Sequence, residues 1–188
     1  MDSGTGETRR PSTQWLLAAH IVAVMLLQST SVAVMSVLPV LARRRFGASD
    51  LQTVLITAAV PAFLALSIFW GALLRRTSLR TYLLIYWMIG LLPLAFVSLA
   101  QSYWHVLACH LVGAIGFAAG PPVTSEFLKR LYPDRWRGRA YAAMTAAALV
   151  GGVAASYWVG EWLSRDGEAF RIYMPAAALV QLVGIGML

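Results

Sequence analysis

Six long apolar runs, separated by short polar clusters, constrain this chain more than any other feature of its sequence. They cover about residues 14–42, 51–74, 81–100, 104–130, 140–160 and 172–188. A helix needs roughly 20 apolar residues to cross the hydrocarbon core of a bilayer. Because water is absent there, each run must satisfy its own backbone hydrogen bonds, which a helix does. The sequence therefore predicts an all-α membrane protein with six transmembrane helices.

The charge of the chain is better explained by membrane topology than by nucleic acid. Only 12% of its 188 residues are charged, against about 25% in soluble domains. The net charge of +7 comes from basic clusters between the apolar runs, which is the pattern of membrane loops. We therefore expect a lipid bilayer as partner and no nucleic acid. The single cysteine, Cys109, offers neither a disulfide nor a metal set, and no metal or other cofactor is expected.

The N-terminal residues 1–13 are polar and are expected to form a disordered cytoplasmic segment, followed by one six-helix bundle over residues 14–188. Arg9 and Arg10 before an apolar run resemble the start of a signal peptide. However, residues 14–42 contain no Asp, Glu, Lys or Arg and are much longer than a 7–15-residue signal core. We therefore interpret this run as a retained transmembrane helix.

The distribution of Lys and Arg predicts the orientation. Short connections make successive helices antiparallel, so alternate loops share one side of the membrane. With a cytoplasmic N-terminus, the inner side holds Arg9, Arg10, Arg75, Arg76, Arg80, Lys129, Arg130, Arg135, Arg137 and Arg139, and the outer side Arg43, Arg44, Arg45, Arg165 and Arg171. The positive-inside rule then favours an integral protein of the cell (inner) membrane with its N-terminus in the cytoplasm.

Two loops resemble signatures of the major facilitator superfamily of transporters. Residues 71–80, Gly-Ala-Leu-Leu-Arg-Arg-Thr-Ser-Leu-Arg, are similar to the family's loop between helices two and three, Gly-x-Leu-x-Asp-Arg-x-Gly-Arg-Arg. The matching residues are Gly71, Leu73, Arg76 and Arg80. Arg75 stands where the family has Asp, and Ser78 where it has Gly. Residues 133–140, Pro-Asp-Arg-Trp-Arg-Gly-Arg-Ala, resemble the family's loop between helices four and five, Pro-x-x-x-Arg-Gly-Arg-Ala.

This resemblance extends over nearly the whole chain through the spacing of the six helices. It implies the N-terminal six-helix half of the family's fold, built as two three-helix inverted repeats. It also implies transport of a small solute by alternating access, with a substrate site near the bilayer midplane. Such a mechanism needs a second six-helix bundle, either a missing C-terminal half or a partner copy. No nucleotide-binding motif is present, so the energy would come from an ion or solute gradient.

Four residues are candidates for the substrate cavity: Gln28, Ser31, His110 and Gly113. Gln28 lies near the middle of the first run with Ser31 beside it, and either residue could instead form hydrogen bonds between helices. His110 could relay protons, because histidine titrates near physiological pH, or it could be a packing residue.

Eight further residues are expected to form a cytoplasmic hinge or gate: Gly71, Arg75, Arg76, Arg80, Glu126, Arg137, Gly138 and Arg139. Glu126 is the only acidic residue within the predicted spans, and an acid inside a membrane is a functional candidate. It lies three residues before Lys129, close to the cytoplasmic face. We therefore predict that Glu126 pairs with the basic hinge rather than with substrate.

Two other functional classes remain open. The first is a six-helix membrane scaffold that transports nothing. The second is an intramembrane enzyme, which would need a Ser–His pair, paired Asp residues or a zinc site. His105 and His110 are five residues apart, a poor spacing for one helix face, and no catalytic residue is assigned. The sequence does not favour an enzyme.

Overall fold

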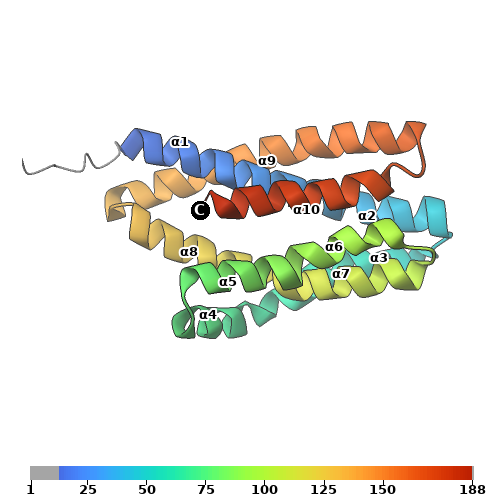
Figure 1. Cartoon of the computed structure of the whole chain (residues 1–188), viewed down its shortest axis with the longest axis horizontal. Coiled ribbons are helices and arrows are strands. Elements are labelled where there is room, and N and C mark those ends of the chain that lie inside the picture. Colours follow the sequence, from blue (N-terminus) through green and yellow to red (C-terminus); the bar gives the residue numbers. More distant parts are fainter. Residues whose placement is uncertain (1–12, 188) are drawn as a thin grey trace, which may run out of the picture.

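The computed structural model describes residues 13–187 and contains six helical spans packed lengthwise as a bundle (Figure 1). The first span consists of α1 (Thr13–Val24), the π-helical η1 (Met25–Ser29) and α2 (Thr30–Phe46), and the second of α3 (Asp50–Phe63), the 3-10 helix η2 (Leu64–Leu66) and α4 (Ser67–Arg76). The third span consists of α5 (Leu79–Tyr86), the π-helical η3 (Trp87–Leu91), α6 (Leu92–Ala95) and the 3-10 helix η4 (Phe96–Leu99). The fourth span consists of α7 (Tyr103–Phe117) and α8 (Gly120–Leu131), the fifth is α9 (Asp134–Arg165), and the sixth is α10 (Phe170–Gly186). Five spans contain between 21 and 32 residues and are long and apolar enough to cross a membrane, and α10 is a shorter apolar helix. The predicted all-α membrane fold is confirmed.

The helix boundaries differ most from expectation in the first and fifth spans. The helix α9 begins at Asp134, directly after Pro133, so the basic residues expected in a loop form its first turns. The helix α2 continues to Phe46 and ends at Gly47, whose φ of 63° is the left-handed conformation that glycine adopts most readily. The predicted disorder of residues 1–13 lies outside the described residues, apart from Thr13.

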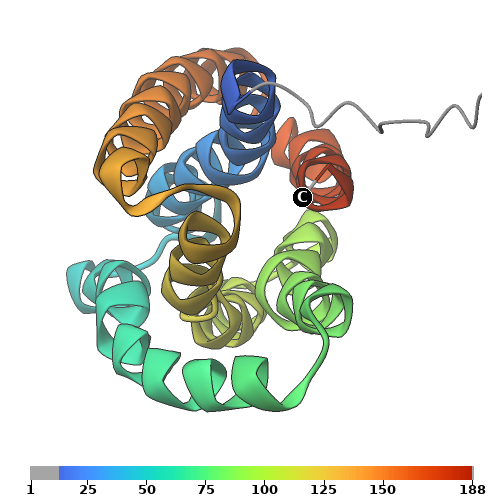
Figure 2. The same cartoon turned by 90° about the vertical axis from the view of Figure 1, so that its left-hand side faces the viewer.

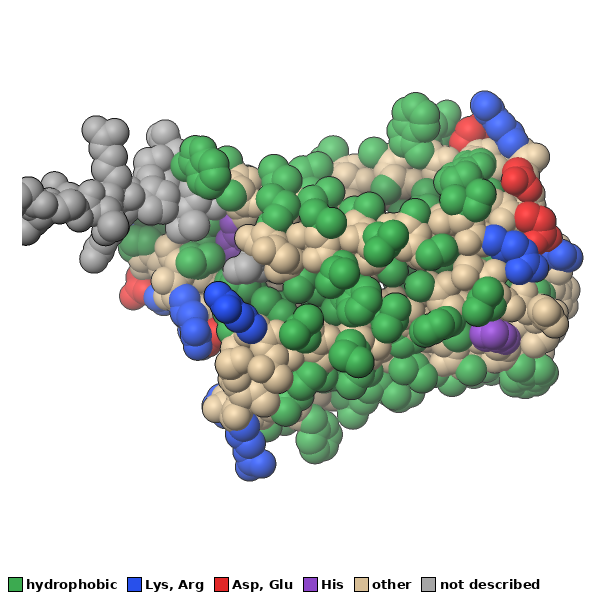
Figure 3. Space-filling view, in the orientation of Figure 1, with side chains coloured by type: hydrophobic (Ala, Val, Ile, Leu, Met, Phe, Trp, Pro, Cys, Tyr) green, Lys and Arg blue, Asp and Glu red, His purple; other side chains and the backbone are tan. Residues whose placement is uncertain are grey.

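The connections lie at two ends of the bundle. Residues 77–78 and 132–133 lie at one end, here called the hinge end, and residues 47–49, 100–102 and 166–169 lie at the other, here called the opposite end. Figure 3 shows charged side chains at both ends and a broad band of hydrophobic side chains between them. Such a band can meet lipid tails, whereas the charged ends need water.

A break between α7 and α8 divides the fourth span, and side chains from neighbouring spans bind carbonyl groups near it. Pro121 and Pro122 occupy the first turn of α8, where their missing N–H groups cost least. Near this break, the Trp70 indole donates to the carbonyl of Ile115 at 2.8 Å, and the Tyr82 hydroxyl donates to the carbonyl of Ala119 at 2.8 Å. The second and third spans are therefore hydrogen-bonded to the break in the fourth.

Glycines bring the backbones of the third and fourth spans into direct contact. A Cβ atom added at Gly116 would lie 2.2 Å from the Cα of Gly90. One added at Gly113 would lie 3.0 Å from the side chain of Leu94. In lipid, helices associate through such close packing, because lipid tails are as apolar as the side chains they replace.

Glycines of the fifth and sixth spans pack against the first span in the same way. A Cβ at Gly151 would lie 2.2 Å from the Ser29 hydroxyl oxygen, and one at Gly152 would lie 2.9 Å from Val32. In the sixth span, a Cβ at Gly184 would lie 3.1 Å from the carbonyl oxygen of Ala23. The first span is thus held closely by both later helices.

One side of the bundle is much less buried than the rest. In the apolar windows of the second and fifth spans, 17% and 22% of residues are buried, against 44–50% in the first, third and fourth. The helix α2 contacts both α9 and α3, so these two sparsely buried spans flank the first span, as the end-on view shows (Figure 2). Large apolar side chains stand exposed along both: Leu51, Val54, Leu55, Ile68, Phe69, Leu149, Val150, Val153, Tyr157 and Trp158.

We predict that Gly116→Ala destabilises the protein by about 1–3 kcal/mol, because the added methyl group must force two backbones apart. Gly120→Ala in the same span is the matched control, since a Cβ there meets nothing within 4 Å. Thermal unfolding in detergent, followed by tryptophan fluorescence, measures both variants. Equal midpoints for the two variants would contradict the close contact.

Candidate functional site

The connection between α4 and α5 consists of two residues whose hydroxyl groups are both hydrogen-bonded. The Thr77 hydroxyl donates to the carbonyl of Leu73 at 3.0 Å, and the Ser78 hydroxyl accepts from the Thr81 N–H at 3.2 Å. Ser78 begins α5 with a φ of −68°, which any residue can adopt. The turn therefore needs no glycine at this position.

The expected pairing of Glu126 with this basic turn is wrong. The Glu126 carboxylate binds Arg130, one helical turn along α8, with its Oε1 atom 2.6 Å from Nε. A partner at i+4 on the same helix is within easy reach, whereas the turn belongs to another span. Arg75, Arg76 and Arg80 are exposed and make no ion pair within the described chain.

A polar hollow of about 610 Å³ nevertheless brings Glu126 and the turn together. It lies between α4 and α8 at the hinge end. Its lining residues are Gly71, Leu74, Arg75, Thr77, Pro122, Ser125, Glu126, Lys129 and Arg130. Two candidates from the second span thus share this hollow with the candidate acid of the fourth, without a direct bond to it.

Arg137 fixes the connection between α8 and α9. Its guanidinium donates to the carbonyl of Lys129 at 3.1 Å and to that of Tyr132 at 3.0 Å, and it pairs with Asp134 at 2.5 Å. These bonds satisfy carbonyl groups that the end of α8 leaves free. Arg139 lies over the Trp136 ring, 5.3 Å from its centroid. Gly138 is exposed, with nothing within 4 Å of an added Cβ.

The candidate cavity residues of the first span have different surroundings. Gln28 belongs to the π-helical segment, is partly exposed, and makes no side-chain hydrogen bond to the described residues. Ser31 is buried, donates to the carbonyl of Leu27 at 2.7 Å, and accepts from the Gln181 amide at 2.9 Å. Ser31 therefore joins the first span to the sixth, while Gln28 is free to meet a ligand.

The two candidates of the fourth span lie in helix contacts. The His110 ring is buried and donates from Nε2 to the carbonyl of Ile56 in the second span at 2.8 Å. Its Nδ1 atom has no hydrogen-bond partner. Gly113 faces the third span. The structure therefore places both residues between helices.

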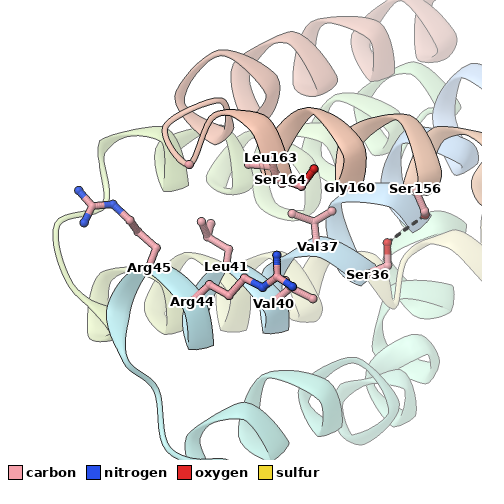
Figure 4. Close-up of a pocket in the computed structure, with 11 residues that line it drawn as sticks. Ser36, Val37, Val40, Leu41, Arg44, Arg45, Ser156, Gly160, Leu163 and Ser164 are labelled. Atoms are coloured by element: carbon pink, nitrogen blue, oxygen red, sulfur yellow. Dashed lines mark hydrogen bonds between the residues drawn. The ribbon is translucent and has the colours of Figure 1, made fainter.

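Sequence reasoning missed a groove of about 490 Å³ between α2 and α9 at the opposite end (Figure 4). Its lining residues are Ser36, Val37, Val40, Leu41, Arg44, Arg45, Ser156, Gly160, Leu163, Ser164 and Gly167. The hydroxyl groups of Ser36 and Ser156 join its two walls at 2.9 Å. The sequence signal for this groove is the arginine triplet at 43–45, about two helical turns after Ser36 in an apolar run.

An ionic network joins three spans beside this groove. Glu168, in the connection before α10, binds Arg45 of α2 at 2.7 Å and Arg171 of α10 at 2.6 Å. Arg171 also donates to the carbonyl of Ser98 in the third span at 3.0 Å. The hydrogen bond from Arg171, aided by the charge of Arg45, holds the pKa of the Glu168 carboxyl below its ordinary value.

Comparisons with known proteins give two findings. The family model described as Major Facilitator Superfamily matches residues 5–187. The crystal structure of a bacterial homolog to the human lysosomal transporter Spinster, in an inward-facing and unoccupied conformation, superposes with a TM-score of 0.66 at 21% identity. That match covers 95% of this chain and 43% of the other, so the present chain spans less than half of that protein's length. A search of curated proteins gives no match.

We predict that His110→Leu lowers stability by about 0.6–2 kcal/mol, because it removes the hydrogen bond between the fourth and second spans. His105→Leu is the control, since the His105 side chain is exposed and makes no such bond. The measurement is the thermal unfolding midpoint in detergent. A His110→Leu protein with the parental midpoint would show that the bond contributes nothing.

We also predict that stability falls as pH drops below 4.5, the ordinary pKa of a glutamate, and that Glu168→Gln removes part of this dependence. The folded-state pKa of Glu168 is lowered, so its contribution is complete above 4.5 and is lost as pH falls through the folded value. Unfolding midpoints between pH 3 and 7 test this. A Glu168→Gln protein that keeps the full parental dependence on pH would contradict this prediction.

Proposed function

Because the chain belongs to the Major Facilitator Superfamily, we propose that it forms one six-helix half of a secondary transporter for a small solute. The described span of 13–187 corresponds to a single bundle, so residues 14–188 would act as one unit. Transport would occur by alternating access, with this bundle rocking against a second one around a site near the bilayer midplane. The second bundle would be a C-terminal half or a partner copy.

The observation that carries this proposal is the sparsely buried side formed by the second and fifth spans. The matched transporter is more than twice as long as the part this chain covers, which leaves room for a second bundle of similar size. A second bundle on this side would cover the exposed apolar residues of α3 and α9. Without it, these residues would face lipid.

Gln28 is the proposed substrate contact from this bundle. It lies near the middle of the first span, it is partly exposed, and its amide has both donors and acceptors to offer. Short π-helical segments inside helices are frequent at functional sites. These properties support Gln28 over Ser31, whose hydroxyl is already bound to Gln181.

The hinge end is proposed to face the cytoplasm and to act in gating. In the described chain this end carries eight Lys and Arg residues and two acids, whereas the opposite end carries five arginines and four acids. The positive-inside rule favours the more basic end as cytoplasmic. The exposed guanidinium groups of Arg75, Arg76 and Arg80 would be available to acidic groups of the second bundle when that end closes.

Flux measured with the whole encoded protein in proteoliposomes tests the proposal, using labelled organic anions, sugars, amino acids and cations as probes. We expect transport of at least one probe class and an at least tenfold loss of flux in Gln28→Ala. Gln101→Ala, in an exposed connection, is the matched control and should keep the parental rate. Glu126→Gln should leave substrate affinity unchanged, because Glu126 pairs with Arg130 at the hinge end.

Failure to move any probe would contradict a transporter and favour a six-helix scaffold. If Glu126→Gln lost substrate affinity and Gln28→Ala did not, Gln28 would not be the substrate contact. The transporter family does not favour an intramembrane enzyme, and no group of three His, Cys, Asp or Glu residues suited to a metal occurs within residues 13–187.

A further inference from the structure

We propose that the groove between α2 and α9 binds the anionic group of a small organic anion through Arg44, with the apolar part of the ligand lying along the groove. This inference rests on the proposed transport function and names the class of solute: a carboxylate or a phosphate ester with an apolar body. The direction of Arg44, the charges around it and the lining of the groove support this assignment.

Arg44 is directed into the groove. In Figure 4 its side chain runs back along α2 past Val40 toward Ser36, whereas the side chain of Arg45 points away. Helical side chains slope toward the N-terminus of their helix, which here carries the guanidinium away from the charged end and over apolar residues. The Arg44 side chain is exposed, so an anion that enters the groove can reach its guanidinium.

No carboxylate of the described chain accompanies Arg44. The ion pairs at this end are Arg43–Asp50 at 3.1 Å, Arg45–Glu168 at 2.7 Å, Arg171–Glu168 at 2.6 Å and Arg165–Glu161 at 2.8 Å. The remaining acid, Asp166, accepts from the backbone N–H of Glu168 at 2.9 Å. Among the described arginines of this end, Arg44 alone makes no ion pair, so an anion from outside the bundle can bind it.

The polar groups of the groove suit an oxyanion. A guanidinium presents a planar fork of donors that matches a carboxylate or a phosphate in two parallel hydrogen bonds. Ser36 donates to the carbonyl of Ala33 at 3.0 Å and shares a bond with Ser156. The Ser36 hydroxyl has a single proton. When that proton binds the Ala33 carbonyl, Ser156 donates to Ser36 and offers a ligand only lone pairs; when it turns to Ser156 instead, the Ser156 proton is free for a ligand. Ser156 can thus adapt to an anion beside Arg44.

The remaining lining suits an apolar body. Val37, Val40, Leu41 and Leu163 are large apolar residues of the groove lining. The volume of about 490 Å³ lies within the range of about 300–1,000 Å³ that is usual for small-molecule sites. The groove therefore combines one unpaired cation with an apolar wall, which favours organic anions over inorganic ones and over neutral solutes.

The groove also lies where a transported solute could reach it. It lies between the first and fifth spans, beside the sparsely buried side that we propose faces the second bundle. Closure by that bundle would exclude water and strengthen the attraction between the guanidinium and the anion. The alternative occupant is a carboxylate side chain of the second bundle. The experiment below separates this side chain from a small organic anion.

The test measures thermal unfolding of the whole encoded protein in detergent with four probes: hexanoate, hexyl phosphate, hexylammonium and hexanol. We expect the two anions to raise the unfolding midpoint in a concentration-dependent way, and the cation and the alcohol to leave it unchanged. In Arg44→Gln the apparent affinity for the anions should fall at least tenfold. In Arg44→Lys this affinity should fall less, because lysine keeps the positive charge but lacks the planar fork of guanidinium donors.

Arg43→Gln is the matched control, since Arg43 is adjacent, binds Asp50 and does not line the groove. It should keep the parental affinity for the anions. Ser156→Ala should weaken anion binding several-fold without changing the preference for anions over hexylammonium. A difference in apparent affinity between hexanoate and hexyl phosphate then shows whether the site prefers a carboxylate or a phosphate ester.

Three results would overturn the inference: no stabilisation by either anion, equal stabilisation by the cation or the alcohol, or equal losses in Arg43→Gln and Arg44→Gln. A carboxylate of the second bundle as occupant would instead leave the parental midpoint unchanged by all four probes, and Arg44→Gln would lower the midpoint without any probe. Flux distinguishes this inference from the proposed function. Parental flux of a substrate in Arg44→Gln would refute the site alone, whereas anion binding without any flux would refute transport alone.

Discussion

The contact between the backbones of Gly90 and Gly116 is the constraint on which the bundle depends. In a bilayer, apolar side chains gain little by leaving lipid for protein, so helices are held by close packing and by hydrogen bonds that lipid cannot offer. At this contact no side chain separates the third span from the fourth. The first span packs on the fifth and sixth through similar glycine contacts. The result is a tightly packed unit.

Most polar groups inside this unit are used to hold it together. His110 binds a carbonyl of the second span, Ser31 binds Gln181 of the sixth, and Trp70 binds a carbonyl near the break in the fourth. Each bond joins two spans at a point where no water can replace it. Few polar side chains are then left for a ligand, and Gln28 and Arg44 are notable because their side chains form no hydrogen bond or ion pair with the described residues.

The two ends of the bundle handle charge differently. At the opposite end, Glu168 ties together arginines of the first and sixth spans, and Arg43 and Arg165 pair with acids of their own, so most of the positive charge is neutralised within the bundle. At the hinge end, Arg75, Arg76 and Arg80 remain exposed and unpaired within the described residues, and Glu126 is occupied by Arg130. Ion pairs between spans therefore stabilise the opposite end, while the hinge end has exposed arginines without an ion pair among the described residues.

The sequence alone determined the number of spans and the all-α class, because the bilayer imposes helices on apolar runs. It could not determine the partners of polar side chains. Ser31 and Gln181 are 150 residues apart, and His110 and Ile56 are 54 apart. Only the packing of helices decided that Ser31 and His110 bind protein and that Arg44 is directed into a groove, because these partners are set by which faces meet in space.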